Sequence, residues 1–207
     1  MGCSLLQSDR GGRGPKEAKR RSTGYSPCAN PKVELELSML VRDATHGDLE
    51  RIVTIYNQTI ASRMVTADLE AVTVDQRRAW FAAHTPDFRP LWVAQEFEDG
   101  PIVAWLSFQS FYGRQAYDAT AEVSLYVDSA MRRSGIGRKF LERAIEHAPS
   151  LGIRNLIGFI FGHNTPSLIL FERFGFTRWG VLPRVAVLDG HERDLVIVGK
   201  RVDSLRR

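Results

Sequence analysis

The stretch "ATAEVSLYVDSAMRRSGIGRKFLERAIEHAPSLGIRNLIGFIF", residues 119–161, decides the fold. A strand-like run at 119–128 is followed by a loop at 129–137, a helix-like run at 138–152 and a second strand-like run at 153–161. A strand, a helix and a strand in this order most simply form a right-handed parallel unit, which puts the loop at the carboxyl end of the first strand. A ligand site is therefore expected in this loop.

The chain on both sides of this unit carries patterns of strands and helices. The segments before it predict a strand, two amphipathic helices and a two-stranded hairpin, at 37–45, 46–62, 73–84, 91–97 and 102–112. After it, apolar residues at helical spacing predict a short helix over 165–176, and alternation around the turn Asp189-Gly190 predicts a hairpin over 185–201. No linker interrupts the pattern, so we predict an α+β fold in one domain, residues 39–203.

The composition is that of a globular protein. Of the 207 residues, 43% are hydrophobic and 25% are charged, which disfavours a chain that is disordered throughout. The longest apolar runs are far shorter than the roughly 20 residues that span a bilayer, so no membrane partner is expected. Cys3 and Cys28 are the two cysteines, which favours a reducing compartment and a cytoplasmic protein. Because the histidines show no ligand spacing, we expect no metal.

The first 38 residues differ from the rest of the chain. They hold seven Lys or Arg against four Asp or Glu and are rich in Gly, Pro and Ser, which predicts a disordered basic tail. A start misassigned upstream of Met39 is the alternative. The remaining residues are nearly neutral, so no nucleic-acid partner is expected of the folded domain, although binding through the tail would show itself as salt-dependent affinity.

The loop of the central unit has the form R-x-x-G-x-G, from Arg132 to Gly137. A helix N-terminus offers unpaired backbone N–H groups and a partial positive charge, so it can hold a phosphate. Gly135 and Gly137 would let the backbone approach the ligand, and Arg133 and Arg138 would add charge. A glycine turn with a solvated basic face is the other interpretation. A P-loop is absent, and Phe140 stands where a dinucleotide fingerprint needs its third glycine.

Further stretches accompany this motif: "HN" at 163–164, "IYNQTI" at 55–60, "FYGRQAYDATAEVSLYV" at 111–127 and "NTPSLILFERFGF" at 164–176. Together they resemble the GNAT superfamily of N-acetyltransferases, and within it the phosphinothricin and methionine sulfoximine acetyltransferase family. The resemblance implies a GNAT-like mixed, mostly antiparallel sheet with splayed central strands and helices on both faces. It also implies acetyl coenzyme A (acetyl-CoA) as cosubstrate and a homodimer.

The same resemblance assigns residues to the coenzyme. The backbone of the strand ending at Val127 would hold the pantetheine arm between the splayed strands, and the glycine loop would hold the pyrophosphate. Side chains at the start of the helix after the next strand would contact the coenzyme further along. The expected coenzyme-binding residues are Leu125, Tyr126, Val127, Arg132, Arg133, Ser134, Gly135, Ile136, Gly137, Arg138, Asn164 and Ser167.

The resemblance also assigns residues to the acceptor, on the same strand and in the stretch before it. Glu122 matches the acidic residue that the family places beside the amine, and it is the candidate general base; a strand glutamate facing solvent is the structural alternative. The resemblance also implies Arg114, Tyr117 and Ser124 as acceptor-binding residues, and the Arg114 guanidinium could bind a carboxylate or phosphinate in bidentate fashion. A surface arginine in a loop and a tyrosine packed on the sheet are the structural alternative. Phe171 stands where many relatives carry a side chain that can protonate the departing sulfur.

We therefore predict an N-acetyltransferase that acts on the primary amine of a small amino-acid-like substrate of the phosphinothricin or methionine sulfoximine type. Two alternatives remain open at this point. One is an acetyltransferase of protein N-termini or lysines, which would need an open groove beside Arg114 and Tyr117. The other is a non-catalytic sensor of acetyl-CoA, an idea that Phe171 motivates because phenylalanine donates no proton.

Overall fold

A computed structural model describes residues 39–203, and the expectations made for residues 1–38 lie outside this part of the chain. The described residues form a seven-stranded sheet in the order β1-β2-β3-β4-β5-β7-β6. All neighbours are antiparallel except β4 and β5, which are parallel. The strands are β1 (Leu40–Asp43), β2 (Leu91–Gln95), β3 (Ile102–Ser110), β4 (Thr120–Val127), β5 (Asn155–Phe161), β6 (Thr177–Leu188) and β7 (His191–Arg201).

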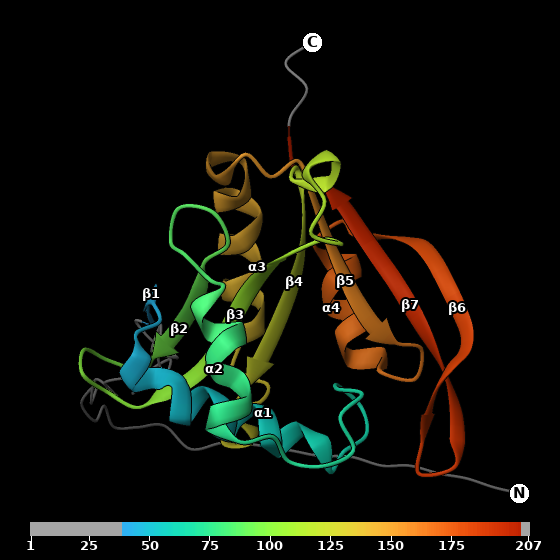
Figure 1. Ribbon diagram of the computed structural model, residues 1–207, viewed down its shortest axis with the longest axis horizontal. Helices are drawn as coiled ribbons and strands as arrows, with labels where there is room; N and C mark the ends of the chain where they lie inside the picture. The colour runs from blue at the N-terminus through green and yellow to red at the C-terminus, as the bar shows by residue number, and fades with distance from the viewer. Residues whose placement is uncertain (1–38, 204–207) are drawn as a thin grey trace, which may run out of the picture. The chain divides into compact units, whose positions relative to one another are not determined.

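Helices cover both faces of the sheet, as predicted (Figure 1). On one face α1 and α2 bury Ile52 and Phe81 against Val93 and Trp105. On the other, α3 and α4 enclose a second apolar core in which Phe140 is fully buried. The helices are α1 (Leu49–Ile60), α2 (Val74–Ala82), α3 (Ile136–His147) and α4 (Thr165–Arg173), with short 3₁₀ turns at His46–Asp48, Gln115–Tyr117, Ser129–Met131 and Ala148–Leu151. No helix of residues 39–203 is long and apolar enough to cross a membrane.

Side chains define where the first two helices begin. Thr73 caps α2 by accepting a hydrogen bond from the Gln76 backbone N–H, and the Gln76 side chain accepts one from the Thr73 N–H. This reciprocal pair satisfies two amides that the helix itself leaves free. Before α1, Asp48 accepts from the Thr45 N–H and forms a two-pronged ion pair with Arg42 of β1. The predicted helix over 46–62 therefore begins as a 3₁₀ turn and becomes α-helical at Leu49.

The C-terminal hairpin is longer than predicted. β6 begins at Thr177, eight residues before the expected start at 185, and its register shifts between Arg178 and Gly180 and again between Leu182 and Ala186. This part of the strand was not predicted because Gly180 and Pro183 are unfavourable in a regular strand. Both residues are tolerated at register shifts such as these. The predicted turn is confirmed: Asp189 and Gly190 both have positive φ, which suits a tight hairpin.

Asp128 connects α1 to the loop that follows β4. Its buried carboxylate accepts hydrogen bonds from Arg51 (2.5 Å), from Gln58 (3.2 Å) and from the backbone N–H of Ala130 (2.8 Å). Burial alone would raise the pKa of Asp128, but these hydrogen bonds and the Arg51 charge outweigh it and the pKa is lowered. The carboxylate thus stabilises the fold in its ionised form.

We expect Asp128→Asn to lower the free energy of unfolding by about 1–3 kcal/mol, because an amide nitrogen would then face buried donors. The loss should shrink as the pH falls through the lowered pKa of Asp128, since below it the parent carboxyl is also neutral. Urea unfolding at several pH values measures both. Asp75→Asn is the control, because Asp75 pairs with Arg78 at a similar distance but on the surface. Equal losses of unfolding free energy in the two variants would contradict a special stabilising role of the buried Asp128 carboxylate.

Candidate active site

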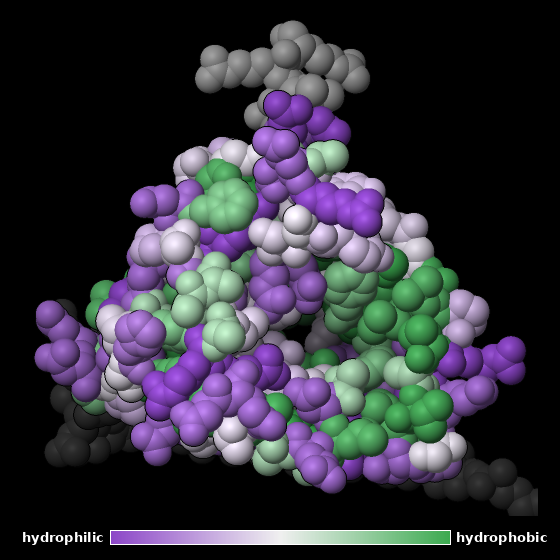
Figure 2. All heavy atoms as spheres, viewed as in Figure 1, coloured by the Kyte–Doolittle hydropathy of each residue, from purple (hydrophilic) through white to green (hydrophobic). Residues whose placement is uncertain are grey.

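The two central strands separate to form a cleft. β4 and β5 are paired from Thr120↔Asn155 to Glu122↔Ile157, and both strands continue beyond the last pair without pairing to each other. Figure 2 shows this face of the molecule hollowed between the positions of β4 and β5 in Figure 1. The cleft is lined by Val65, Val123, Ser124, Leu125, Tyr126, Gly158, Phe159, Ile160, Asn164, Ser167, Leu170 and Phe171.

The N-terminus of α3 is built to receive an anion. Gly135 precedes the helix with φ +85°, and no side chain of the described residues caps it. The amides of the first turn therefore have no intrahelical partners. Arg132, Arg133 and Arg138 are exposed around them, and no ion pair to an acid is found for these three in residues 39–203. Free amides with surrounding positive charge fit the pyrophosphate of a coenzyme.

Two predicted coenzyme residues have a different place from the one expected. The helix begins at Ile136 and not at 138, so Gly137 lies in its first turn and not in the loop. A Cβ at Gly137 would lie 3.4 Å from side-chain atoms of both Leu125 and Leu170, so its absence brings α3 close to β4 and α4. The side chain of Ile136 is buried in the core, which leaves its backbone amide to meet a ligand. Ser134 donates its hydroxyl to the Met131 carbonyl within the loop.

Glu122 lies at the point where β4 and β5 part. Its neighbours Ala121 and Val123 point into the core beneath α3, and strand alternation directs Glu122 to the opposite face, where α1 packs. Burial raises the pKa of the Glu122 carboxyl, and a hydrogen bond of 3.2 Å from the Ser124 hydroxyl opposes part of that rise. Glu122 is not itself among the residues that line the cleft, but Ser124, its hydrogen-bond partner, is. A carboxyl group with a raised pKa next to the lining is suited to accept a proton.

Arg114 and Tyr117 do not line the cleft. They belong to the loop between β3 and β4, where the Tyr117 side chain is 43% exposed and packs edge-on against Phe111. Tyr112 completes this aromatic group. The loop lies at the amino end of β4, so these residues remain predicted acceptor contacts outside the cleft itself.

α4 and its cap contribute a further wall of the cleft. The Asn164 side chain caps this helix by accepting from the Ser167 N–H, and both residues line the cleft. Phe171 is 5% exposed, packs against Phe176 and also lines the cleft. No proton donor therefore stands at position 171. His163 does not supply one with Nε2, because that nitrogen is hydrogen-bonded to the Arg63 carbonyl.

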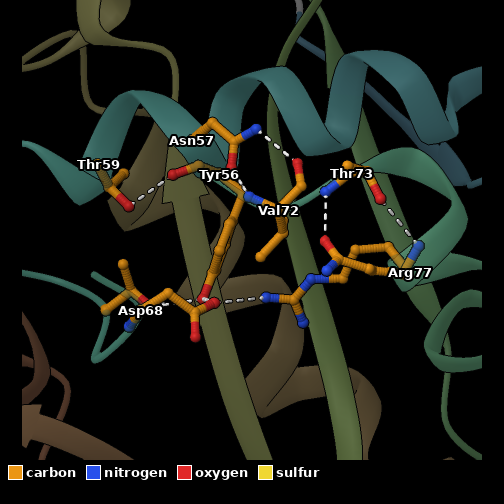
Figure 3. A network of polar contacts seen from close by, with 9 residues as sticks. Tyr56, Asn57, Thr59, Asp68, Val72, Thr73 and Arg77 are labelled. Carbon is orange, nitrogen blue, oxygen red and sulfur yellow. Dashed lines mark hydrogen bonds and ion pairs between the residues drawn. The ribbon is translucent and has the colours of Figure 1, made fainter. Parts of the chain in front are cut away.

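Sequence patterns missed the contribution of the segment between α1 and α2. Val65 lines the cleft, and next to it Tyr56, Asp68 and Arg77 form a polar network, with the Asp68 carboxylate between the Tyr56 hydroxyl and the Arg77 guanidinium (Figure 3). The guanidinium also lies over the Tyr56 ring, 4.3 Å from its centre. No sequence motif predicts contacts of this kind between separate segments. Within residues 39–203 no three His, Cys, Asp or Glu side chains gather into a group that could hold a metal ion.

Comparison with known proteins agrees with this geometry. A family model described as Acetyltransferase (GNAT) family matches residues 53–176, more than half of the chain. The chain belongs to the GNAT acetyltransferase family. YwnH of Bacillus subtilis strain 168, whose name places it among the phosphinothricin acetyltransferases, is similar to this GNAT chain. It is 55% identical over 164 residues, which cover 79% of this chain and 99% of YwnH.

Other relatives extend the likeness. A Salmonella typhimurium protein named L-methionine sulfoximine/L-methionine sulfone acetyltransferase is 30% identical to the GNAT chain over 80% of the chain and 96% of its own length. The solved structure of an S. typhimurium acetyltransferase with its cofactor acetyl-CoA has a TM-score of 0.74 and 29% identity, covering 82% of this chain and 96% of its own. The predicted splayed GNAT sheet is confirmed, and the protein is an N-acetyltransferase that uses acetyl-CoA.

Proposed function

We propose that this GNAT enzyme acetylates the primary amine of a small amino-acid-like acceptor of the phosphinothricin or methionine sulfoximine type. The observation that carries the proposal is the position of Glu122, a part-buried carboxyl group with a raised pKa at the last β4 residue that pairs with β5, hydrogen-bonded to Ser124 of the cleft lining. The names of the relatives from B. subtilis and S. typhimurium point to the same acceptor class.

The coenzyme site of the proposal uses mostly backbone. The amides at the start of α3, with Ser134 and the three arginines around them, would hold the pyrophosphate, and the unpaired edge of β4 at Leu125, Tyr126 and Val127 would hold the pantetheine arm. Asn164 and Ser167 would contact it from α4. Acetyl-CoA supplies an acyl carbon bonded to a sulfur leaving group. A β4 amide directed at the carbonyl oxygen would stabilise the charge that develops there.

The proton of the amine would leave through Glu122. An alkylammonium must lose a proton before its nitrogen can form a bond to the acyl carbon while the carbon–sulfur bond breaks. The Glu122 carboxylate would accept this proton directly or through water, and its raised pKa reduces the mismatch with the amine. Because Phe171 donates nothing, sulfur would depart as thiolate, which a thiol of pKa about 8.5 permits.

The acceptor would be held by Arg114, Tyr117 and Ser124. Ser124 lines the cleft beside Glu122, while Arg114, in the β3–β4 loop at the amino end of β4, would meet the carboxylate or phosphinate of an acceptor whose amine lies at Glu122. An acceptor panel with detection of free thiol tests the assignment. We expect turnover of phosphinothricin, methionine sulfoximine or related amino acids. Turnover confined to peptide N-termini or peptide lysines would contradict the proposal, and no turnover with tight acetyl-CoA binding would favour the sensor.

A cytoplasmic homodimer formed by a single folded domain, residues 39–203, is part of the same proposal. Support comes from β6, the edge strand, which exposes a row of large apolar side chains of the kind that interfaces cover. They are Trp179, Val181, Leu182, Val185 and Val187, between 41% and 58% exposed. Sedimentation equilibrium of the purified protein at micromolar concentration measures the state, and a monomer would contradict the dimer.

A further inference from the structure

The segment between α1 and α2, residues 61–72, forms what we call the strap. It has no regular helix or strand, yet Val65 from its middle is part of the cleft lining. The other lining residues come from β4, β5, α4 and its cap Asn164, so the strap is a separate wall. Its Thr66 contacts Tyr56 of α1, which places the strap on the face that α1 covers. A wall without secondary structure of its own must be held in place by contacts with its neighbours.

Two consecutive side chains hold two consecutive carbonyl groups of the strap. His163 Nε2 donates to the Arg63 carbonyl at 2.8 Å, and Asn164 Nδ2 donates to the Met64 carbonyl at 2.9 Å. We call this pair the clamp. It joins segments 100 residues apart and ends immediately before Val65. The backbone that carries Val65 is therefore fixed from the side of β5 and α4.

The other end of the strap is also anchored. The Tyr56 hydroxyl contacts the Thr66 hydroxyl and donates to Asp68 at 2.5 Å, and Arg77 donates to the same carboxylate at 3.2 Å (Figure 3). Thr66 is buried. Val65 thus lies between the clamp on one side and this network on the other, so its position depends on both.

The His163 ring is held by its hydrogen bond to the strap. A carbonyl oxygen can only accept a hydrogen bond, so Nε2 carries the proton. Nδ1 is buried and has no hydrogen-bond partner in the described part of the chain. A buried polar atom left without a partner costs stability, so an apolar residue would be preferred here if the ring served packing alone. The hydrogen bond to Arg63 gives a reason for the histidine.

We propose that His163 is a positioning residue that sets the acceptor-side wall of the cleft by fixing the strap at Val65. The inference rests on the proposed function, because it concerns the acceptor. Asn164 adds a link to the coenzyme side: its oxygen caps α4, its nitrogen holds Met64, and the residue itself lines the cleft. The side chain of Val65 then selects acceptors by size.

Steady-state kinetics of His163→Ala test the clamp. We expect KM for the acceptor to rise about tenfold, the equivalent of one lost hydrogen bond that orders the wall. KM for acetyl-CoA should stay within twofold, because backbone amides at the start of α3 would hold the pyrophosphate, and within the described residues these amides share no hydrogen bond with His163 or the strap. His163→Gln should restore most of the acceptor KM, since the glutamine amide nitrogen can donate to the same carbonyl. His147→Ala is the control, because His147 is an exposed histidine at the C-terminal end of α3 and contacts no residue of the strap.

The outcomes separate the inference from the function on which it rests. If the parent turns over no acceptor, the proposed function fails and the inference fails with it. If the parent is active and His163→Ala leaves the acceptor KM unchanged, or raises both KM values equally, only the inference is overturned. Val65→Ala provides a second route if His163→Ala does not fold. It should change the ratio of kcat/KM between a bulky and a small acceptor by about tenfold, and an unchanged ratio would overturn the inference.

Discussion

Replacement of Glu122 with Gln is expected to lower kcat/KM by about 10²–10⁴-fold near neutral pH, the usual contribution of general-base catalysis. Gln keeps the size of the side chain and can still accept from Ser124, so the cleft should remain intact. The dissociation constant for acetyl-CoA, measured by calorimetry, should therefore not change. Free-thiol release with a small amino-acid acceptor measures the rate.

The pH profile gives a second readout of the same residue. A general base works when deprotonated, so kcat/KM of the parent should fall as the pH drops through the pKa of Glu122. Burial raises that pKa, which places the acid limb above the value near 4.3 of an ordinary glutamate. In Glu122→Gln this limb should disappear. A limb that persists in the variant would assign it to another group.

Stability separates loss of catalysis from loss of fold. Since the pKa of Glu122 is raised in the folded state, its ionised carboxylate costs stability above the unfolded pKa. Glu122→Gln should accordingly melt no lower than the parent at pH 7. Glu142→Gln, on the exposed face of α3, is the control and should retain full activity. Full activity in Glu122→Gln would exclude Glu122 as the general base.

Gly135→Ala is expected to weaken acetyl-CoA binding about tenfold, equivalent to roughly one charge-assisted hydrogen bond to the pyrophosphate. Gly135 has φ +85°, a conformation that alanine adopts at a cost of about 1–2 kcal/mol. The variant can relieve this strain by rotating the backbone, which would redirect the amides at the start of α3. Isothermal titration calorimetry measures the affinity.

Gly152→Ala is the matched control for this prediction. Gly152 also has a positive φ, +71°, and at both glycines an added Cβ would meet no heavy atom of the described residues within 4 Å. The two variants should therefore lose similar stability through backbone strain alone. Gly152 follows the C-terminal end of α3, away from the anion site. Equal effects on acetyl-CoA affinity would mean that the amides at Gly135 do not bind the pyrophosphate.

Much of the sheet and its helices could be predicted from the sequence because local signals agreed with the fold. Thr73 and Gln76 form the predicted start of α2, and Asp189-Gly190 form the predicted turn. Residues 177–184 of β6 were missed because Gly180 and Pro183 break the alternation that marks a strand. The start of α3 was placed two residues late because Gly137 resembles a loop residue, although its small size serves helix packing.

The site was predictable where the backbone motif itself forms it, and less so where it depends on distant segments. The R-x-x-G-x-G motif runs into the N-terminus of α3, where amides are free, as its glycines indicated. The separation of β4 from β5 came from the family resemblance, since no local pattern states where pairing between strands ends. The clamp of His163 and Asn164 on the strap spans 100 residues, and such a contact has no periodicity to reveal it.

The early end of the β4–β5 ladder has a consequence for the ligand-free enzyme. Beyond Glu122 and Ile157, backbone groups that face the gap have no strand partner within the described residues, so they must be hydrated. Amide protons along this edge should exchange with solvent far faster than those on the side of β4 that is paired to β3. The amide groups of a bound pantetheine arm would then form hydrogen bonds with this unpaired edge, as a neighbouring strand would. Binding of acetyl-CoA could therefore be followed as protection of a few central amides from exchange.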